Sequence, residues 1–271
     1  MRTALTALVE RLEGPSLEGT NVIPWGCPVP SFGDPTRAKI ATLGLNPSNR
    51  EFVDVYGNEL DGEERRFHTL KSLGINRWSE ATSRHLRLIA ESCRAYFCRN
   101  PYNAWFKKLD YLIAGTQTSY YNNAVPACHL DLIPYATTCK WTSLSRQQRS
   151  SLLSAACDTL GMLILESPIR VLILNGNSVV ERFQEICSIE LQKEVMPAWA
   201  LPRRSETDVV GFAYAGMVRD IGGVSLRRDI LILGFNHNIQ SSFGVTTQVT
   251  ASIQQWITKM TREQIREPAR S

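Results

Sequence analysis

The sequence predicts an α/β protein, a single domain of three αβα layers around a central, mainly parallel four-stranded sheet. Four short apolar runs alternate with helical segments, which is typical of buried parallel strands that helices cover on both faces. These runs are residues 39–43, 127–133, 170–174 and 229–233. The chain has 271 residues, 43% of them hydrophobic and 21% charged, and is long enough to bury a core without disulfides or metals.

The first half of the chain contains a helix, a stiff loop and the first strand. Residues 3–13 place their leucines on one helical face, and residues 14–37 hold five prolines and four glycines. The strand at 39–43 ends at Gly44. A long helix is expected from Ser79 to about Cys98, and a second one to about Ile113, because Asn100-Pro101 interrupts the helical pattern.

The second half repeats the alternation of strand and helix. Ser145 and Gln148 form a capping box that opens a helix, and Pro168 stops it. Residues 190–228 are expected to be irregular except for one strand at 209–214. The other expected elements are helices 145–166, 178–188 and 246–260 and the strands named above. The domain core is expected at 22–260, and the tail at 261–271 is expected to fray.

Positive charge is concentrated in residues 65–108. This segment has ten lysine and arginine residues against two glutamates, a local net charge of +8, whereas the whole chain carries +4. Seven aromatic residues are interleaved with them. A basic segment with aromatics is typical of a nucleic-acid surface, and Arg84 and Arg87 are its candidate DNA contacts. The alternative is a solvated helix face above a core of aromatics.

Cysteine usage indicates a cytoplasmic protein with reduced thiols. The seven cysteines form no CxxC pair, and the N-terminus lacks the apolar core of a signal peptide. No run of 18 apolar residues is present, so no membrane span is expected. The nearest approach to a metal or iron–sulfur pattern is Cys93 and Cys98. We expect no metal, no organic cofactor and no obligate protein partner, and we expect a monomer.

The segments that follow the strands are the expected ligand site, because open parallel sheets bind ligands at the carboxyl ends of their strands. These segments are rich in amides and poor in carboxylates. The sequence has no dinucleotide-binding or P-loop motif, no GxSxG nucleophile elbow, no local triad signature, and no pair of strand-end acids for sugar hydrolysis.

Asn46 and His237 remain as the candidate catalytic residues. The amide of Asn46 can orient a water, which suits a glycosidic bond that breaks before water attacks, and His237 can donate a hydrogen bond to the leaving group. Two alternatives stay open. Asn46 could serve only the turn before Pro47, and His237 could be a structural histidine.

Gly44-Leu45-Asn46-Pro47 resembles the first motif of the mismatch-specific and single-strand-selective branches of the uracil-DNA glycosylase superfamily. The resemblance covers roughly residues 22–245 and implies a uracil-DNA glycosylase-like fold in which Asn46 positions the attacking water. The later pattern of Gly57, Leu60 and Arg66-Phe67 is similar to a segment of the mismatch-specific branch. In that branch a phenylalanine at the Leu60 position stacks on the flipped base. Phe52 or Tyr56 is therefore the expected stacking ring here, unless both belong to the core.

The remaining motifs of the resemblance carry further site residues. The proline-rich loop 24–35, with Ser31, resembles the loop that pinches the DNA backbone. Asp131 falls near the position of the asparagine that reads the base edge in that family, although it could instead form a structural ion pair with Lys140 or an arginine. Residues 236–241 resemble the second motif, without its proline and with its register open between Asn236 and His237. The implied DNA contacts and minor-groove wedge in this stretch are Asn238, Ile239, Gln240 and Ser241.

These residues lead to the hypothesis of a monofunctional DNA glycosylase that flips its target base. A carboxylate only accepts hydrogen bonds, so Asp131 matches the amino group of cytosine and not the O4 atom of uracil. A modified cytosine of phage DNA is expected, since removal of ordinary cytosine would destroy the host genome. The alternatives are a uracil or mismatch repair enzyme, a catalytically silent DNA-binding protein and a hydrolase of free nucleosides.

Overall fold

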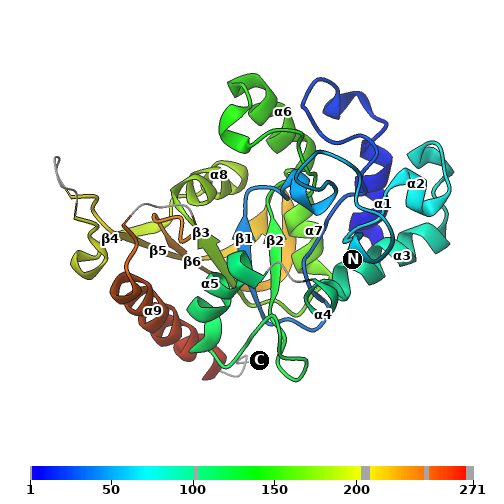
Figure 1. Ribbon diagram of the computed structural model, residues 1–271. Coiled ribbons are helices and arrows are strands. Elements are labelled where there is room, and N and C mark those ends of the chain that lie inside the picture. The colour runs from blue at the N-terminus through cyan, green and yellow to red at the C-terminus, as the bar shows by residue number, and fades with distance from the viewer. Residues whose placement is uncertain (1, 101–102, 203–207, 241–243, 267–271) are drawn as a thin grey trace.

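One mixed sheet of six strands runs through the protein in the order β2-β1-β3-β6-β5-β4 (Figure 1). The computed structural model describes residues 2–100, 103–202, 208–240 and 244–266. The strands are β1 Ile40–Gly44, β2 Cys128–Asp131, β3 Val171–Asn175, β4 Gln192–Val195, β5 Phe212–Ile221 and β6 Val224–Phe235. β2, β1, β3 and β6 pair in parallel, whereas β5 pairs with β6 and β4 in antiparallel fashion.

The α/β class agrees with the sequence analysis, but the expected four-stranded, mainly parallel sheet is wrong. Residues 190–228, expected to be largely irregular, supply β4, β5 and the start of β6. Gly222 and Gly223, both with positive φ, make the tight turn that joins β5 to β6. The outer parts of these strands are exposed and polar, so they lack the continuous apolar runs that mark the buried parallel strands.

Nine helices longer than one 3₁₀ turn lie in the described ranges. They are α1 Arg2–Arg11, α2 Leu70–Leu73, α3 Ser83–Arg94, α4 Tyr96–Arg99, α5 Asn103–Ala114, α6 Arg146–Ala156, α7 Thr159–Leu165, α8 Asn177–Cys187 and α9 Thr247–Arg266. The expected helix 145–166 is two helices, and α9 extends beyond the expected end at 260. The capping box of Ser145 and Gln148 is confirmed by two reciprocal hydrogen bonds. None of these helices has the length and apolar character needed to cross a membrane.

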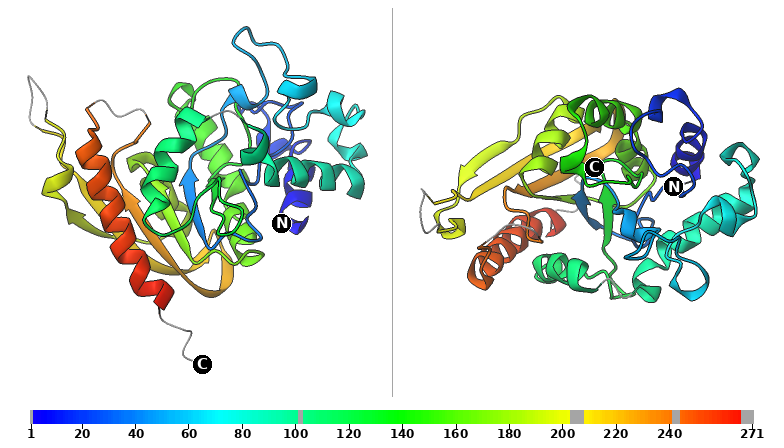
Figure 2. Two further views of the ribbon diagram at one scale, coloured as in Figure 1. Left: turned by 60° about the horizontal axis from the view of Figure 1, so that its bottom comes forward. Right: turned by 45° about the horizontal axis from the view of Figure 1, so that its top comes forward.

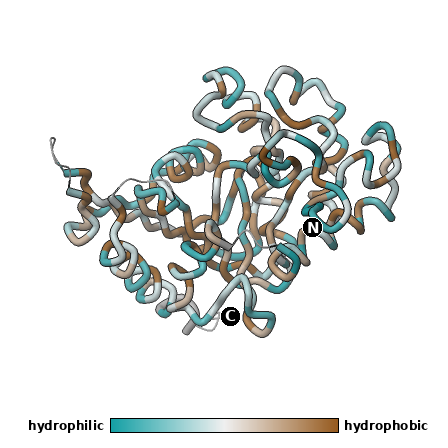
Figure 3. Tube along the Cα trace, in the orientation of Figure 1, coloured by the Kyte–Doolittle hydropathy of each residue, from teal (hydrophilic) through white to brown (hydrophobic). Residues whose placement is uncertain are grey.

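Two apolar cores lie on the two faces of the sheet, because successive side chains of a strand alternate between faces. In β3, Val171 and Ile173 join the core beneath α3, α5 and α9, whereas Leu172 and Leu174 join the core beneath α7 and α8. α5 and α9 pack side by side on the first face (Figure 2). Hydrophobic residues concentrate along the central strands (Figure 3). The parallel part of the sheet is therefore buried on both faces.

The proline-rich loop covers the edge of the sheet beside β2. Phe32 and His129 exchange backbone hydrogen bonds of 2.8 and 2.9 Å, and Val22 bridges Thr137 further along. Ser31 is fully buried, and its hydroxyl donates to the carbonyl of Gly33 at 3.0 Å. The expectation that Ser31 contacts DNA is therefore not met. The loop protects a sheet edge and delivers Phe32 to the ends of the strands.

Candidate functional site

A pocket of about 670 Å³ opens where β1, β2 and β3 end. We call it the strand-end pocket. Residues from several distant segments line it, as expected for the carboxyl edge of a parallel sheet. Of the residues expected at the site, the pocket brings together Gly44, Leu45, Asn46, Pro47, Asp131, Asn236 and Asn238. The first motif and the end of β2 therefore face the same space.

The amide of Asn46 is held in one orientation. Its Nδ2 donates to the carbonyl of Pro47 and to the hydroxyl oxygen of Thr137, each at 3.1 Å. The Thr137 hydroxyl donates its own hydrogen to the carbonyl of Cys139 at 2.7 Å, so it can only accept from Asn46. The nitrogen end of the amide is thereby assigned, and Oδ1 stays available to accept a hydrogen bond from a water in the pocket.

Asp131 belongs to a line of polar groups buried beneath the pocket. The Tyr120 hydroxyl lies 2.5 Å from Thr42 Oγ1, which lies 2.7 Å from His129 Nδ1. His129 Nε2 lies 3.4 Å from Asp131 Oδ1. Every group is satisfied when Tyr120 donates to Thr42 and Thr42 donates to Nδ1. The imidazole proton then sits on Nε2, facing Asp131.

Gly44 makes room for this arrangement. In the parallel ladder Gly44 is the register partner of Asp131. A Cβ atom at Gly44 would overlap Asp131 Oδ1 and would stand 3.0 Å from His129 Nε2. The missing side chain therefore lets two polar groups of β2 stand over the end of β1.

Glu51 is a pocket residue that the sequence analysis missed. It is 3% exposed, its Oε2 accepts a hydrogen bond from the Tyr96 hydroxyl at 3.0 Å, and the same oxygen forms an ion pair with Arg66, whose Nη1 lies 3.5 Å away. Loss of hydration raises the pKa of Glu51 to about 7, and the charge of Asp131 adds to this, whereas Arg66 and Tyr96 oppose it. The only signal in the sequence is its position five residues after Asn46.

Aromatic side chains form much of the remaining wall, but they are not those expected from the resemblance. Phe32, Trp105, Phe106 and Trp141 line the pocket. The rings of the first three lie 5.6, 5.3 and 5.4 Å from the His129 ring, centroid to centroid. These rings come from the proline-rich loop and from α5, which no local sequence motif connects with the pocket.

The three expected stacking residues lie outside the strand-end pocket. Phe52 is buried in the core against Trp25 and Phe67. Tyr56 is 87% exposed. Leu60 is buried and lines the same pocket as Tyr56, which is not the strand-end pocket. None of them can stack on a ligand in the strand-end pocket in this structure.

His237 faces away from the pocket as well. It is buried, its Nε2 donates to the carbonyl of Trp199 at 2.7 Å, and burial lowers the pKa of the imidazole. The expectation that it contacts a leaving group is not met. Asn236 borders the pocket, but its amide spans the backbone N–H of Phe212 and the carbonyl of Val210, each at 2.8 Å.

The rest of the second motif is also engaged within the protein. Ile239 is buried in the core, so it does not form an exposed wedge. Gln240 accepts a hydrogen bond of 2.8 Å from Asn175 Nδ2, and Ser241 lies outside the described residues. Asn175 borders the pocket from the end of β3. Its Oδ1 is buried and has no hydrogen-bond partner within the described chain.

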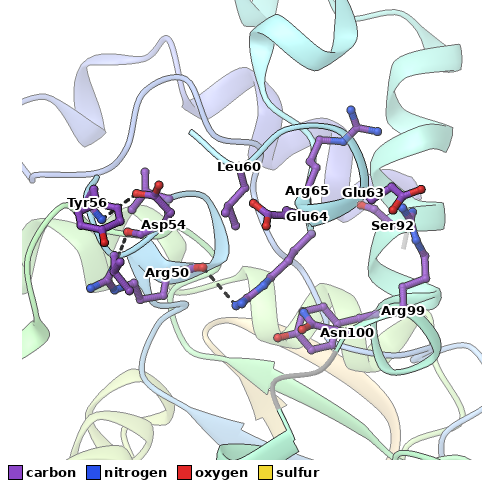
Figure 4. Close-up of a pocket in the computed structure, with 14 residues that line it drawn as sticks. Arg50, Asp54, Tyr56, Leu60, Glu63, Glu64, Arg65, Ser92, Arg99 and Asn100 are labelled. Carbon is purple, nitrogen blue, oxygen red and sulfur yellow. Dashed lines mark hydrogen bonds between the residues drawn. The ribbon is translucent and has the colours of Figure 1, made fainter. Parts of the chain in front are cut away.

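A second pocket, of about 820 Å³, lies beside the first, and we call it the arginine pocket. Figure 4 places Arg50 and Tyr56 on one side and Arg65 and Arg99 on the other. Arg66 and Tyr96 also line it, and both reach the carboxyl group of Glu51. Glu51 therefore stands between the two pockets.

Positive charge extends from the arginine pocket toward α3. Loss of hydration, together with Arg65, Arg99 and His85, lowers the pKa of His68 to about 4. Arg84 and Arg87 are exposed on α3. Asp54, Glu63 and Glu64 line the arginine pocket as well and offset part of its positive charge.

No protein-family model matches this sequence, and the search of curated proteins finds no match either. The chemistry of the site must therefore be read from its geometry. Within the described residues no cluster of three or more His, Cys, Asp or Glu side chains could hold a metal ion. The strand-end pocket combines a fixed amide acceptor, two buried acids and aromatic walls, which suits a flat, polar ring with hydrogen-bonding edges.

Replacing Gly44 with alanine should destabilise the protein by about 1–3 kcal/mol, because the new methyl group overlaps Asp131 and must displace it. Urea denaturation measures this loss, and the imidazole NMR signals of His129 should shift. Gly14→Ala is the matched control, since its nearest contact would be an ordinary 3.4 Å. Equal effects of the two substitutions would contradict this account of Gly44.

Proposed function

We propose that the protein is a monofunctional DNA glycosylase that hydrolyses the N-glycosidic bond of a flipped base and leaves an abasic site. The observation that supports this best is that Asn46 and Asp131 face one pocket from the ends of neighbouring strands. An amide acceptor can hold a water, and a buried carboxylate can read a base edge. A base buried inside a duplex cannot reach such a pocket, so the nucleotide must be flipped out of the stack.

The Oδ1 atom of Asn46 is the group that orients the water. An amide is too weak a base to take a proton, so the glycosidic bond must break largely before the water attacks. The sugar then passes through an oxocarbenium ion, and the water held by Asn46 adds to C1′. Neither metal nor organic cofactor takes part in this scheme.

A cytosine-type base fits the carboxylate of Asp131. His129 faces Oδ1, which leaves the other oxygen to accept from the exocyclic amino group of the base. A mismatched buried polar group costs about 1–3 kcal/mol, enough to reverse a preference between cytosine and uracil. We propose a modified cytosine in phage DNA as the substrate and defence against phage as the role. A uracil or mismatch repair enzyme is the alternative.

DNA is proposed to lie across the cationic surface of α3 and the arginine pocket. Phosphate contacts there would supply affinity without reading sequence. We further propose that the protein acts as a monomer in the cytoplasm, where its seven cysteines, all of them free thiols, would stay reduced.

Replacing Asn46 with alanine should reduce single-turnover excision by about 10²-fold or more while leaving DNA affinity nearly unchanged, since only the placement of water is lost. Excision is read as alkaline strand cleavage on DNAs that carry normal, deaminated and modified bases. Asn123→Ala is the control, because Asn123 is exposed and lies outside the pocket. Equal losses of affinity and rate would mark Asn46 as a folding residue.

Replacing Asp131 with asparagine should shift excision from the cytosine class toward uracil by about tenfold or more, because an amide can donate to O4 where a carboxylate repels it. The ratio of excision rates on the two substrates measures the shift. If the wild-type protein removes uracil efficiently and ignores every modified cytosine, the repair assignment replaces this one.

Reversing both Arg84 and Arg87 to glutamate should weaken binding to all DNA sequences alike and reduce the salt dependence of binding. Fluorescence anisotropy at several salt concentrations tests this. Arg182→Glu on α8 is a control, since Arg182 lies outside the proposed DNA surface. Unchanged affinity in the double variant would place the DNA surface elsewhere.

A further inference from the structure

We propose that Glu51 is the general acid of this site and delivers a proton to a ring nitrogen of the base as the glycosidic bond breaks. This inference rests on the proposed glycosylase function and extends it to the departure of the base. No motif pointed to Glu51. It emerges from the way the fold buries this carboxyl group in the wall of the strand-end pocket.

The position of Glu51 suits contact with a bound base. The residue ends the short 3₁₀ turn Asn49–Glu51, which follows directly on the first motif, and it lines the same pocket as Asn46 and Asp131. Both donors from the protein, Tyr96 and Arg66, approach Oε2. Because neither group approaches Oε1, that oxygen is the one left to face a ligand.

The surroundings of Glu51 keep a proton on it near neutral pH. Burial is the largest cause of its raised pKa of about 7, and Asp131, on β2, raises it further. Arg66 and the Tyr96 hydroxyl favour the charged form and keep the pKa from rising higher. His129 faces the pocket beside Asp131. Because the pKa is raised, the acid form dominates below about pH 7 and is lost above it.

A cytosine-type base needs this proton more than uracil does, because its ring is a poorer anionic leaving group. As the C1′–N bond breaks, its electron pair moves to the base. The Glu51 proton moves to the ring nitrogen beside the amino group, and the base leaves neutral. The water oriented by Asn46 then adds to C1′ and gives up one proton, which returns to the Glu51 carboxylate. The net reaction is hydrolysis.

Asp131 and His129 cannot act as the general acid. Asp131 is an acceptor in the proposed complex, toward both His129 and the amino group of the base. The ring of His129 is fixed between Thr42 and Asp131. Glu51 is therefore the residue of the pocket that can give up a proton to the base without breaking the arrangement that reads the base edge.

The test is the pH dependence of single-turnover excision between about pH 5.5 and 9, on whichever modified-cytosine DNA the wild-type protein cleaves. The wild-type rate should fall about tenfold per pH unit above the Glu51 pKa of about 7. Glu51→Gln should bind DNA within about threefold of wild type, lose about 10²-fold in rate at pH 6, and lose this alkaline decline. Glu190→Gln, at an exposed acid far along the chain, is the control.

The Tyr96→Phe variant provides a second test, in which Glu51 itself is kept. Loss of the hydroxyl that stabilises the charged form should move the alkaline decline to higher pH, a shift that a merely structural defect would not produce. The Tyr96→Phe variant also tests the role of Glu51 if Glu51→Gln does not fold. A wild-type alkaline decline that persists in Glu51→Gln, or that stays fixed in Tyr96→Phe, overturns the inference alone. Absence of excision by the wild-type protein on every base overturns the proposed function together with it.

Discussion

The site depends on the close approach of β2 to β1 at Gly44, where a side chain would occupy the space of Asp131. Parallel pairing brings the two strand ends into register, and the missing Cβ leaves room for a carboxylate and an imidazole. Without that space Asp131 would have to point elsewhere, and the pocket would lose the group proposed to read the base. Gly44 of the first motif thus leaves the space that Asp131 and His129 of the neighbouring strand occupy.

Burial of two acids in one pocket has a predictable consequence. Two carboxylates that share a site of low polarity do not both ionise easily, and the more desolvated one keeps its proton. Here the burial of Glu51 and the charge of Asp131 act in the same direction, and Arg66 limits the effect. The fold can therefore offer a hydrogen-bond acceptor and a proton donor side by side.

The sequence was informative where local chemistry decides the structure, and silent where packing decides it. The strands β1, β2 and β3 followed from apolar runs, and the position of Asn46 followed from what comes after the first of them, whereas Asp131 was expected at the site only through the resemblance. The antiparallel strands β4 and β5 were largely missed because their exposed faces carry polar residues. Only tertiary packing brings Trp105 and Phe106 of α5 to the pocket, so no spacing rule could identify them.

The sequence also indicated the wrong histidine for the pocket. His237 follows a strand, as a site residue should, yet the chain turns it inward to the carbonyl of Trp199. His129 lies within β2, where the alternation of side chains points it toward the pocket. A position within a strand or two residues past its end decides which way a side chain faces, and a single sequence does not define strand ends so closely.

Two features of the pocket fit the proposed cytosine-type substrate. A carboxylate at Asp131 matches the amino group of a cytosine-type base, and a protonated Glu51 supplies what such a base lacks as a leaving group. Uracil would need neither, because it departs as a better stabilised anion and presents an acceptor where cytosine presents a donor. A pocket specific for uracil would bind its base better with an amide at position 131 and would not require a buried acid at position 51. The recognition of the base and the chemistry of its release are thus consistent with each other.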